Sequence, residues 1–443
     1  MARSQDGREA LPLATLTPVD PFYERRPPFE TRALRRSQAV LKKLAQRIVW
    51  GLFGALGYVV RDRAPLPLPL AGDPAIRRIL VVRVDMLGDT VLTTPAVRAL
   101  RRAFPGAKID LLVRSSTAGI LAGDPDIHRV LSYDSSAWKS WRRLGEIARL
   151  FAGVRHPRYD LAISVCGDMG SILTRLAGAR RRVGYVGEAY PHFMTHPVLG
   201  KRYEKHQHET RYVLDLARVV GACVEPGDER PWLRVLPAAR DTIDAHFEAA
   251  REAVGRHGPV IAIHPGAKNG RAKRWPIGHY ARLSDRLSRE LDALIVLTGS
   301  PNERLLTDAL AARMTEPHLD LTGKTSLPEL TALMAASAVV VTGDSGPMHI
   351  ACAVNTPVVA IHGPTDPGLS GPSAPDAIIL RRDLWCAPCY DASATAECRF
   401  GNPVCMKDIS PAEVFTATLT QLHIEAPRPT NAAPTRYVAA RTR

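Results

Sequence analysis

A Gly-Asp-Ser-Gly turn follows an apolar run in the carboxyl-terminal half of the chain. Residues 339–341 are three valines, typical of a buried strand, and the turn and cap residues Thr342-Gly343-Asp344-Ser345-Gly346 come next. Pro347 suits the first position of a helix. Such a loop offers backbone N–H groups and the positive helix end to an anion such as a diphosphate. An ordinary strand-to-helix turn with a good cap would use the same residues.

A second strand-to-helix loop carries four cations. It follows His264-Pro265-Gly266-Ala267, precedes Trp275-Pro276, and contains Lys268, Arg271, Lys273 and Arg274. Like charges this close repel one another unless an anion lies among them, and lysine is a good partner for phosphate. The alternative is a solvated basic loop, although the flanking Gly and Trp-Pro residues favour an ordered one.

Carboxylates follow two other predicted strands. Ser300 and Glu303 lie after one of them, where Glu303 could bind ribose hydroxyls or simply begin a helix. Nearer the amino terminus, Asp85 and Asp89 flank Gly88. A carboxylate at this point can accept a proton from a substrate hydroxyl, whereas Asp89 could also act as a helix N-cap.

The elements that must position these loops alternate between strands and helices, which indicates parallel sheets covered on both faces. The sequence predicts an α/β protein with two Rossmann-like, doubly wound domains, 76–235 and 236–425, that face a cleft. The expected strands are 79–84, 108–113, 129–132, 161–165, 182–185, 260–264, 293–298, 319–321, 339–341, 358–361 and 378–380. The expected helices include 90–104, 241–254, a helix from 277, and 411–422.

Charge and composition narrow the possible partners. The chain has 443 residues and a formal net charge of +15, which suggests an anionic partner. Aromatic residues make up only 6% and no nucleic-acid-binding signature is present, so we expect no nucleic-acid partner. An odd number of cysteines, seven, and no signal peptide lead us to expect a reducing cytoplasm.

The first 75 residues form a basic extension that is expected to be partly disordered. Within it, residues 35–63 place five Arg and Lys residues before the apolar block 48–60. Thirteen residues at helical rise span about 20 Å, short of the roughly 30 Å hydrocarbon core. We therefore expect an amphipathic helix on the inner-membrane surface, the alternative being a helix packed on the protein. Residues 426–443 are expected to be a flexible tail.

Three motifs, in order, carry a resemblance to a known family. They are Arg83-Val84-Asp85-Met86-Leu87-Gly88-Asp89 with Leu92-Thr93-Thr94-Pro95, His264-Pro265-Gly266-Ala267 with Lys273-Arg274-Trp275-Pro276, and Gly343-Asp344-Ser345-Gly346 with His349. Together they resemble glycosyltransferase family 9, the lipopolysaccharide heptosyltransferases. The resemblance runs from about residue 77 to 422, and the long basic extension lies outside it.

The resemblance implies a two-domain GT-B fold and an enzyme without a cofactor. It implies that a heptosyl group moves, with inversion and without a metal, from an ADP-heptose donor to an anionic lipopolysaccharide inner-core acceptor. Asp89 would be the catalytic base and the second domain would hold the donor. The implied donor residues are Lys273, Ser300, Glu303, Asp344, Ser345, Gly346 and His349, with Glu303 at the ribose. The implied location is the cytoplasmic face of the inner membrane.

Four cysteines near the end of the second domain allow two interpretations. Cys386 and Cys389 form a Cys-x-x-Cys pair, and Cys398 and Cys405 follow without the usual close spacing. They could bind zinc or be reduced structural thiols. Cys166, Cys223 and Cys352 are expected to be buried in the core.

Two other functions compete with glycosyl transfer. A UDP-sugar epimerase could use a similar two-domain fold, but the Asp-Gly loops do not resemble one. A membrane-associated binder of nucleotide sugar or anionic glycolipid, without catalysis or with another specificity, would not need both Asp89 and Lys273, which are present.

Overall fold

The computed structural model describes part of the chain, all of it within one unit, residues 54–443. The described residues are 66–69, 71–134, 144–155, 157–165, 167–185, 191–200, 207–268, 270–390, 397–424 and 438–439. The predicted membrane helix within 35–63 lies outside them. Among the described residues, no helix is both long enough and apolar enough to cross a membrane.

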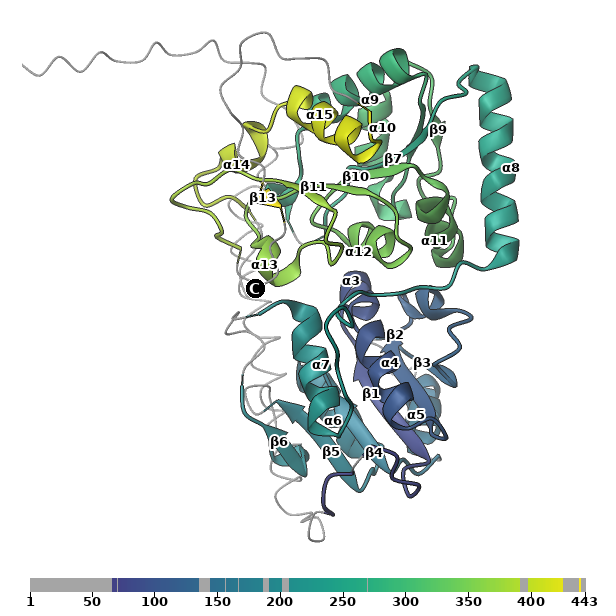
Figure 1. The fold of residues 1–443 in the computed structure, drawn as a ribbon, viewed down its shortest axis with the longest axis vertical. Helices are drawn as coiled ribbons and strands as arrows, with labels where there is room; N and C mark the ends of the chain where they lie inside the picture. Colours follow the sequence, from purple (N-terminus) through teal and green to yellow (C-terminus); the bar gives the residue numbers. More distant parts are fainter. Residues whose placement is uncertain are drawn as a thin grey trace, which may run out of the picture. The chain divides into compact units, whose positions relative to one another are not determined.

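The first sheet has six parallel strands in the order β3-β2-β1-β4-β5-β6 (Figure 1). They are β1 (Arg78–Arg83), β2 (Lys108–Arg114), β3 (Arg129–Tyr133), β4 (Leu161–Ser164), β5 (Arg181–Tyr185) and β6 (His196–Val198). Strand β6 was not predicted. The strand order reverses between β1 and β4, so the loop after β1 emerges at the switch point where open α/β sheets bind ligands.

The second sheet repeats this topology in the order β13-β12-β11-β10-β7-β8-β9. Its strands are β7 (Val260–His264), β8 (Leu294–Leu297), β9 (Leu319–Asp320), β10 (Val339–Gly343), β11 (Val358–Ile361), β12 (Ile378–Leu380) and β13 (Val438–Ala439). All pairs are parallel except β12 with β13. The switch point lies between β7 and β10, whose loops carry the cations and the Gly-Asp-Ser-Gly turn. Strand β13 lies in the predicted tail.

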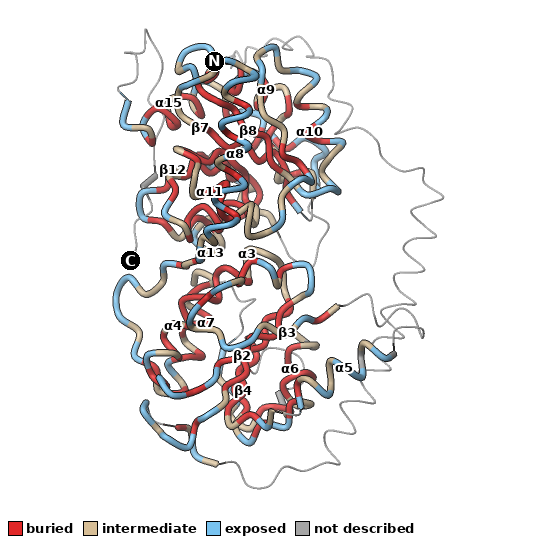
Figure 2. Tube along the Cα trace, turned by 90° about the vertical axis from the view of Figure 1, so that its right-hand side faces the viewer, coloured by how far each residue is buried: buried red, intermediate tan, exposed pale blue. Residues whose placement is uncertain are grey.

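Alternate residues of a strand point to opposite faces of its sheet. Helices cover both faces, so both sets of side chains are buried. In β1, Ile79 and Val81 belong to one buried cluster and Leu80 and Val82 to another. Figure 2 shows buried residues, in red, along strands of both sheets, such as β2 and β4 of the first and β7 and β8 of the second. The helices are α3 (Leu87–Val91), α4 (Thr94–Ala103), α5 (Leu144–Arg155), α6 (Gly167–Leu176), α7 (Glu209–Val219), α8 (Pro237–Val254), α9 (Ile277–Leu291), α10 (Arg304–Ala311), α11 (Leu327–Ala336), α12 (Gly346–Ala353), α13 (Pro367–Ser370), α14 (Val404–Lys407) and α15 (Pro411–Gln421).

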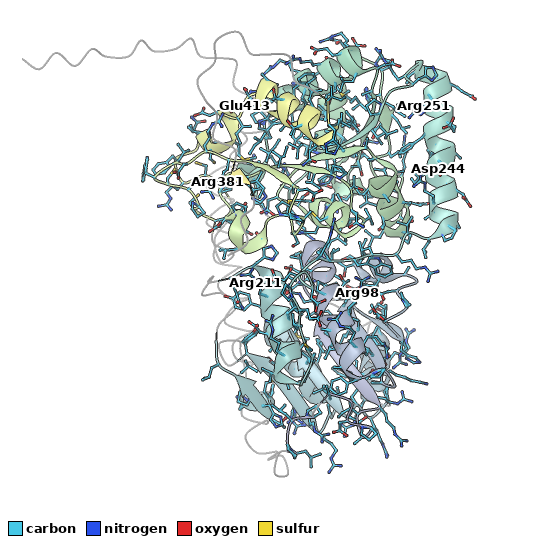
Figure 3. The ribbon with its side chains drawn as sticks, in the orientation of Figure 1. Arg98, Arg211, Asp244, Arg251, Arg381 and Glu413 are labelled. Carbon is cyan, nitrogen blue, oxygen red and sulfur yellow. The ribbon has the colours of Figure 1, made fainter. Side chains whose placement is uncertain are left out.

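Helix α8 connects the segment after the first sheet to β7. It begins at Pro237, four residues before the predicted start at 241, because proline fits the first helical turn. It ends before Gly255, whose φ of 64° is the left-handed conformation of a helix C-cap. Figure 3 shows its charged residues Asp244 and Arg251.

The predicted helix 90–104 is wrong, since the structure has two helices, α3 and α4, in this region. The break follows from Pro95, which has no N–H to donate to the carbonyl of Val91. The hydroxyl of Thr94 donates to that carbonyl instead, at 2.8 Å. Helix α3 is therefore a separate short element that carries Gly88 and Asp89 at the switch point of the first sheet.

Candidate active site

A cavity of about 780 Å³ joins the carboxyl-end loops of the two sheets. This volume is in the range of small-molecule binding sites. Described residues of the first domain that line it are Asp85, Met86, Leu87, Gly88, Arg114, Ser116 and Thr117. From the second domain come, among others, His264, Lys268, Arg271, Arg274, Ser300, Glu303, Ser345 and Gly346. The loops at both switch points therefore share one cavity.

Helices α3 and α12 meet beside this cavity through two motif glycines. A Cβ atom on Gly88 would lie only 2.6 Å from Cδ2 of His349. A Cβ atom on Gly346 would lie 3.1 Å from Cδ2 of Leu87. A side chain at Gly88 would force the His349 ring to move, and one at Gly346 would crowd Leu87. The glycines of two sequence motifs thus allow the two switch-point loops to approach each other.

A fully buried arginine, Arg83, organises the carboxylates of the first domain. Its Nη2 donates to Oδ1 of Asp89 at 3.0 Å and to Oε1 of Glu209 at 2.8 Å. Its Nε lies 3.3 Å from Oδ2 of Asp85. A buried guanidinium needs such partners, because an uncompensated buried charge is costly. The result is a fixed group of three acidic side chains at the carboxyl end of β1.

Asp89 has a different place in its helix from the one predicted. The N-cap of α3 is Met86, and Asp89 is the third helical residue, so the alternative role of Asp89 as the N-cap is excluded. Its Oδ2 accepts a hydrogen bond from the backbone N–H of Met86 at 3.1 Å, as the acidic residue of a capping box does. The Asp89 side chain is 25% exposed, but it is Asp85 that lines the cavity.

Glu303 and Ser300 lie together at the end of β8. Oε2 of Glu303 accepts hydrogen bonds from the Ser300 N–H at 2.8 Å and from its hydroxyl at 2.7 Å. A Cβ atom on Gly266, in the loop after β7, would lie only 1.9 Å from Oε1 of Glu303, so only glycine fits at position 266. Burial would raise the pKa of Glu303, but nearby His264 and the hydrogen bonds from Ser300 lower it below its ordinary value. Glu303 is therefore an anion on the cavity wall.

Lys273 and Asp344 form a buried ion pair between the loops that follow β7 and β10. Nζ of Lys273 lies 2.7 Å from Oδ2 of Asp344, and the two side chains are 11% and 10% exposed. Burial would raise the pKa of Asp344, but the Lys273 ammonium holds it below its ordinary value. Neither residue is among those that line the cavity. The pair ties the loop after β7 to the loop after β10.

The loop that carries the cations is ordered by Trp275. Its indole is fully buried and donates through Nε1 to the carbonyl of Ile409 at 2.8 Å. This agrees with the prediction that the Trp-Pro sequence orders the loop. Within it, Arg271 lies 3.2 Å from Glu397, while Lys268 is exposed at the cavity.

His349 is buried at the contact between α12 and α3, outside the cavity lining. Its Nδ1 has no hydrogen-bond partner among the described residues. Burial lowers the pKa of His349 to about 3, although the Asp344 carboxylate opposes this shift. The imidazole is therefore neutral at physiological pH and acts here as a packing group between the two loops.

This buried imidazole predicts a loss of stability in acid. Above the ordinary pKa of 6.5, folded and unfolded chains both carry it neutral; below it, only the unfolded chain binds the proton. We expect the free energy of unfolding to fall by about 1.4 kcal/mol per pH unit from this group as pH drops from 6.5 towards 3. The midpoints of urea unfolding at pH 7 and pH 5 measure this decrease in stability. His349→Gln should show a smaller decrease, and an equal decrease would contradict the prediction.

The structure brings four of the eight predicted site residues to the cavity wall: Ser300, Glu303, Ser345 and Gly346. Three others do not line the cavity: Lys273, Asp344 and His349. Asp89 does not line it either, and its carboxylate accepts a hydrogen bond from Arg83, which also pairs with Asp85. Sequence reasoning assigned no role to Arg83, Glu209, Arg114, Ser116 or Thr117. A lone charge at the end of an apolar strand is a signal that could have found Arg83 and Arg114. Nothing local marks Glu209.

The cysteines give a mixed result. Cys386, Cys389, Cys398 and Cys405 line a second cavity of about 280 Å³. Among the described residues, no group of three or more His, Cys, Asp or Glu side chains is arranged to hold a metal ion. Cys352 is buried as predicted, but Cys223 is exposed in the segment after α7, so the prediction that Cys223 is buried is wrong. Cys166 lies outside the described residues.

Comparison with known proteins finds heptosyltransferases. The model of glycosyltransferase family 9 (heptosyltransferase) matches residues 147–399. Lipooligosaccharide heptosyltransferase 2 of Haemophilus influenzae is 30% identical over 310 residues, which are 68% of this chain and 88% of that protein. The structure of the E. coli ADP-heptose lps heptosyltransferase II has a TM-score of 0.62 at 26% identity and covers 78% of this chain and 98% of its own.

A glycosyltransferase family 9 structure from Veillonella parvula matches with a TM-score of 0.67 and 24% identity, over 81% of this chain and 99% of its own. The two doubly wound sheets and these matches confirm the predicted GT-B fold. The family match covers more than half of the chain, and the resemblance inferred from three motifs is confirmed. The chain belongs to glycosyltransferase family 9, the heptosyltransferases, and is a glycosyltransferase.

Proposed function

We propose that this enzyme transfers a heptosyl group from ADP-heptose to an anionic, lipopolysaccharide-type inner-core acceptor, with inversion at the anomeric carbon. The observation that carries the proposal is the shared cavity. It joins the carboxylate loop after β1 to the Ser345-Gly346 turn and the cationic loop of the second domain. The names of the relatives, heptosyltransferases of lipooligosaccharide and lipopolysaccharide, support this choice of donor and acceptor.

The second-domain wall suits a nucleoside diphosphate. Ser345 and Gly346 begin helix α12, whose first N–H groups and positive dipole end attract a phosphate group. Lys268 and Arg274 add positive charge on the same wall. Glu303 offers carboxylate oxygens of the kind that accept hydrogen bonds from ribose hydroxyls. Lys273, Asp344 and His349 would hold these loops in place from behind the wall.

The reaction needs one proton transfer and one departing anion. The acceptor hydroxyl oxygen forms a bond to the anomeric carbon while its proton passes to a carboxylate, for which we propose Asp89. The bond between the anomeric carbon and the diphosphate oxygen breaks, and ADP leaves with the electron pair. Cations and helix N–H groups on the second-domain wall stabilise the charge on the departing ADP. We propose that they do so without a metal.

Product analysis tests the proposed function. The enzyme is incubated with ADP-heptose and an inner-core acceptor that lacks heptose, and products are identified by mass spectrometry. We expect one added heptosyl unit per acceptor and one ADP released. Release of a rearranged sugar without acceptor modification would indicate an epimerase. Binding of ADP-heptose without any product would indicate the non-catalytic binder.

We also propose that residues 35–63 hold the enzyme on the inner-membrane surface. The support is sequence: five basic residues beside an apolar block of thirteen. Deletion of residues 1–70 should leave a folded, active enzyme that no longer sediments with anionic vesicles, while the full chain does. Vesicles of neutral lipid are the control, because they remove the electrostatic part of binding. Loss of folding on deletion would show that the segment belongs to the core.

A further inference from the structure

Arg114 brings a positive charge to the first-domain wall of the cavity. It is the last residue of β2 and lies beside Val84, since the strand register pairs Arg83 with Val113. Its Nε donates to the carbonyl of Val84 at 2.7 Å. This bond fixes the guanidinium next to the residue that precedes Asp85. It uses one of five N–H donors, and no carboxylate of the described residues forms an ion pair with the guanidinium.

The other cations of the cavity belong to the opposite wall. Among the described first-domain residues that line the cavity, Arg114 is the one cation. It forms no ion pair with any carboxylate of the described residues, whereas Arg271 across the cavity is paired with Glu397. In the proposed function, the donor diphosphate is bound at Lys268 and Arg274, which line the second-domain wall. Arg114 is therefore available to a different anionic group.

The turn after β2 holds Arg114 in position. The backbone N–H and the hydroxyl of Thr117 both donate to the Arg114 carbonyl, at 2.9 and 3.0 Å. The N–H of Ser115 donates to the carbonyl of Tyr133 at 3.0 Å, which ties the turn to β3. Ser116 stands exposed on the cavity wall between them. A guanidinium fixed in this way, on a wall that also carries the exposed Ser116, suits a planar or tetrahedral oxyanion.

We propose that Arg114 binds an anionic group of the acceptor, a carboxylate or a phosphate, and so sets the acceptor hydroxyl against the carboxylates on Arg83. The inference rests on the proposed function, in which the first-domain wall receives the acceptor. Its geometric basis is the bond to Val84, because Asp85 is the next residue in the chain. An acceptor anchored on Arg114 lies next to the loop of Asp85 and Asp89. Arg114 thereby selects acceptors that carry a negative charge near the reacting hydroxyl.

Steady-state kinetics with Arg114→Gln tests the proposal. We expect the KM for the acceptor to rise about 10- to 100-fold, as loss of a charge-assisted hydrogen bond does, with the calorimetric Kd for ADP unchanged. Arg114→Lys keeps the positive charge but loses the planar, forked set of N–H donors. Its KM for the acceptor should therefore rise less than that of Arg114→Gln. Arg180→Gln is the matched control, because it removes the same charge from an exposed arginine just before β5, at the opposite edge of the sheet.

Modified acceptors identify the anionic group. One acceptor has its carboxylates reduced to alcohols and another has its phosphates removed. The acceptor that lacks the anchored group should bind the wild-type enzyme weakly and be indifferent to Arg114→Gln. An unchanged acceptor KM in Arg114→Gln would overturn the proposal, and so would a weakened Kd for ADP with normal acceptor affinity.

Calorimetric binding of the acceptor, in the presence of ADP, separates this proposal from the function on which it rests. If the wild-type enzyme binds the acceptor through Arg114 but transfers no heptose, only the proposed reaction is wrong. If the wild-type enzyme transfers heptose and Arg114→Gln binds the acceptor normally, only this inference is wrong. Failure of the wild-type enzyme to bind any acceptor would overturn both.

Discussion

Asp89→Asn is expected to lower kcat by about 10²- to 10⁴-fold, the usual contribution of a general base. The acceptor hydroxyl must lose its proton as it attacks, and asparagine cannot accept that proton. The Kd for ADP, measured by calorimetry, should stay near the wild-type value, because Asp89 lies on the first domain. Rapid-quench measurement of a single turnover reports the chemical step directly.

The environment of Asp89 adds a stability cost to this substitution. Asp89 accepts from both Met86 N–H and Arg83 Nη2, so one of these two donors must face the new amide NH₂ group. We expect a loss of about 1–3 kcal/mol in the free energy of unfolding, as for an unsatisfied buried donor. Glu209→Gln is a matched control, since it removes the charge of another carboxylate on Arg83 but leaves the β1 loop intact. It should retain most of the activity.

Asp85→Asn decides between the two carboxylates of the loop. Both form ion pairs with Arg83, but only Asp85 of the two lines the cavity. If Asp85→Asn loses activity while Asp89→Asn keeps it, the base is Asp85. If both variants remain active, neither carboxylate is the base and the mechanism proposed here is wrong.

Lys273→Ala is expected to cost about 3–5 kcal/mol of stability, because it leaves the buried carboxylate of Asp344 without its counter-ion. Nζ of Lys273 and Oδ2 of Asp344 are 2.7 Å apart, and both side chains are about nine-tenths buried. The Lys273 ammonium also lies 5.1 Å from the ring centroid of Tyr390, a contact that alanine cannot make. A lower midpoint of urea unfolding measures the effect.

A double variant separates the structural role of Lys273 from donor binding. Lys273→Met with Asp344→Asn removes both charges and should recover much of the lost stability. If Lys273 also contacts the diphosphate, the double variant should still bind ADP more weakly by about 1–3 kcal/mol. Normal ADP affinity in the stable double variant would show that Lys273 only supports the loops. Full stability of Lys273→Ala would contradict the buried pair itself.

Short-range patterns in the sequence determined the fold class and the site loops. Apolar runs of three to six residues, separated by turn and helical segments, predicted the strands of both sheets except β6 and β13, and the alternation that makes them parallel. The same patterns placed the carboxylate, cationic and Gly-Asp-Ser-Gly loops at carboxyl ends of strands. The three motifs also indicated the family. These features depend on neighbouring residues, so the local sequence contains them.

Local sequence also contained the break between α3 and α4, in the form of Pro95, but the prediction extended one helix across it. The error mattered, because the break makes α3 a separate helix whose third residue is Asp89. Its carboxylate then caps Met86 and binds Arg83, instead of serving as an N-cap.

Only the tertiary structure decided which loop residues face the cavity and which support it. Glu209 joins Arg83 across 126 positions of the chain, and Lys273 turns away from the cavity to a carboxylate on another loop. Gly88 meets His349 from the other domain. Such partners are set by how two sheets and their helices pack, and burial then requires each charge to find an opposite one. The sequence supplied the charged residues, and packing chose their partners.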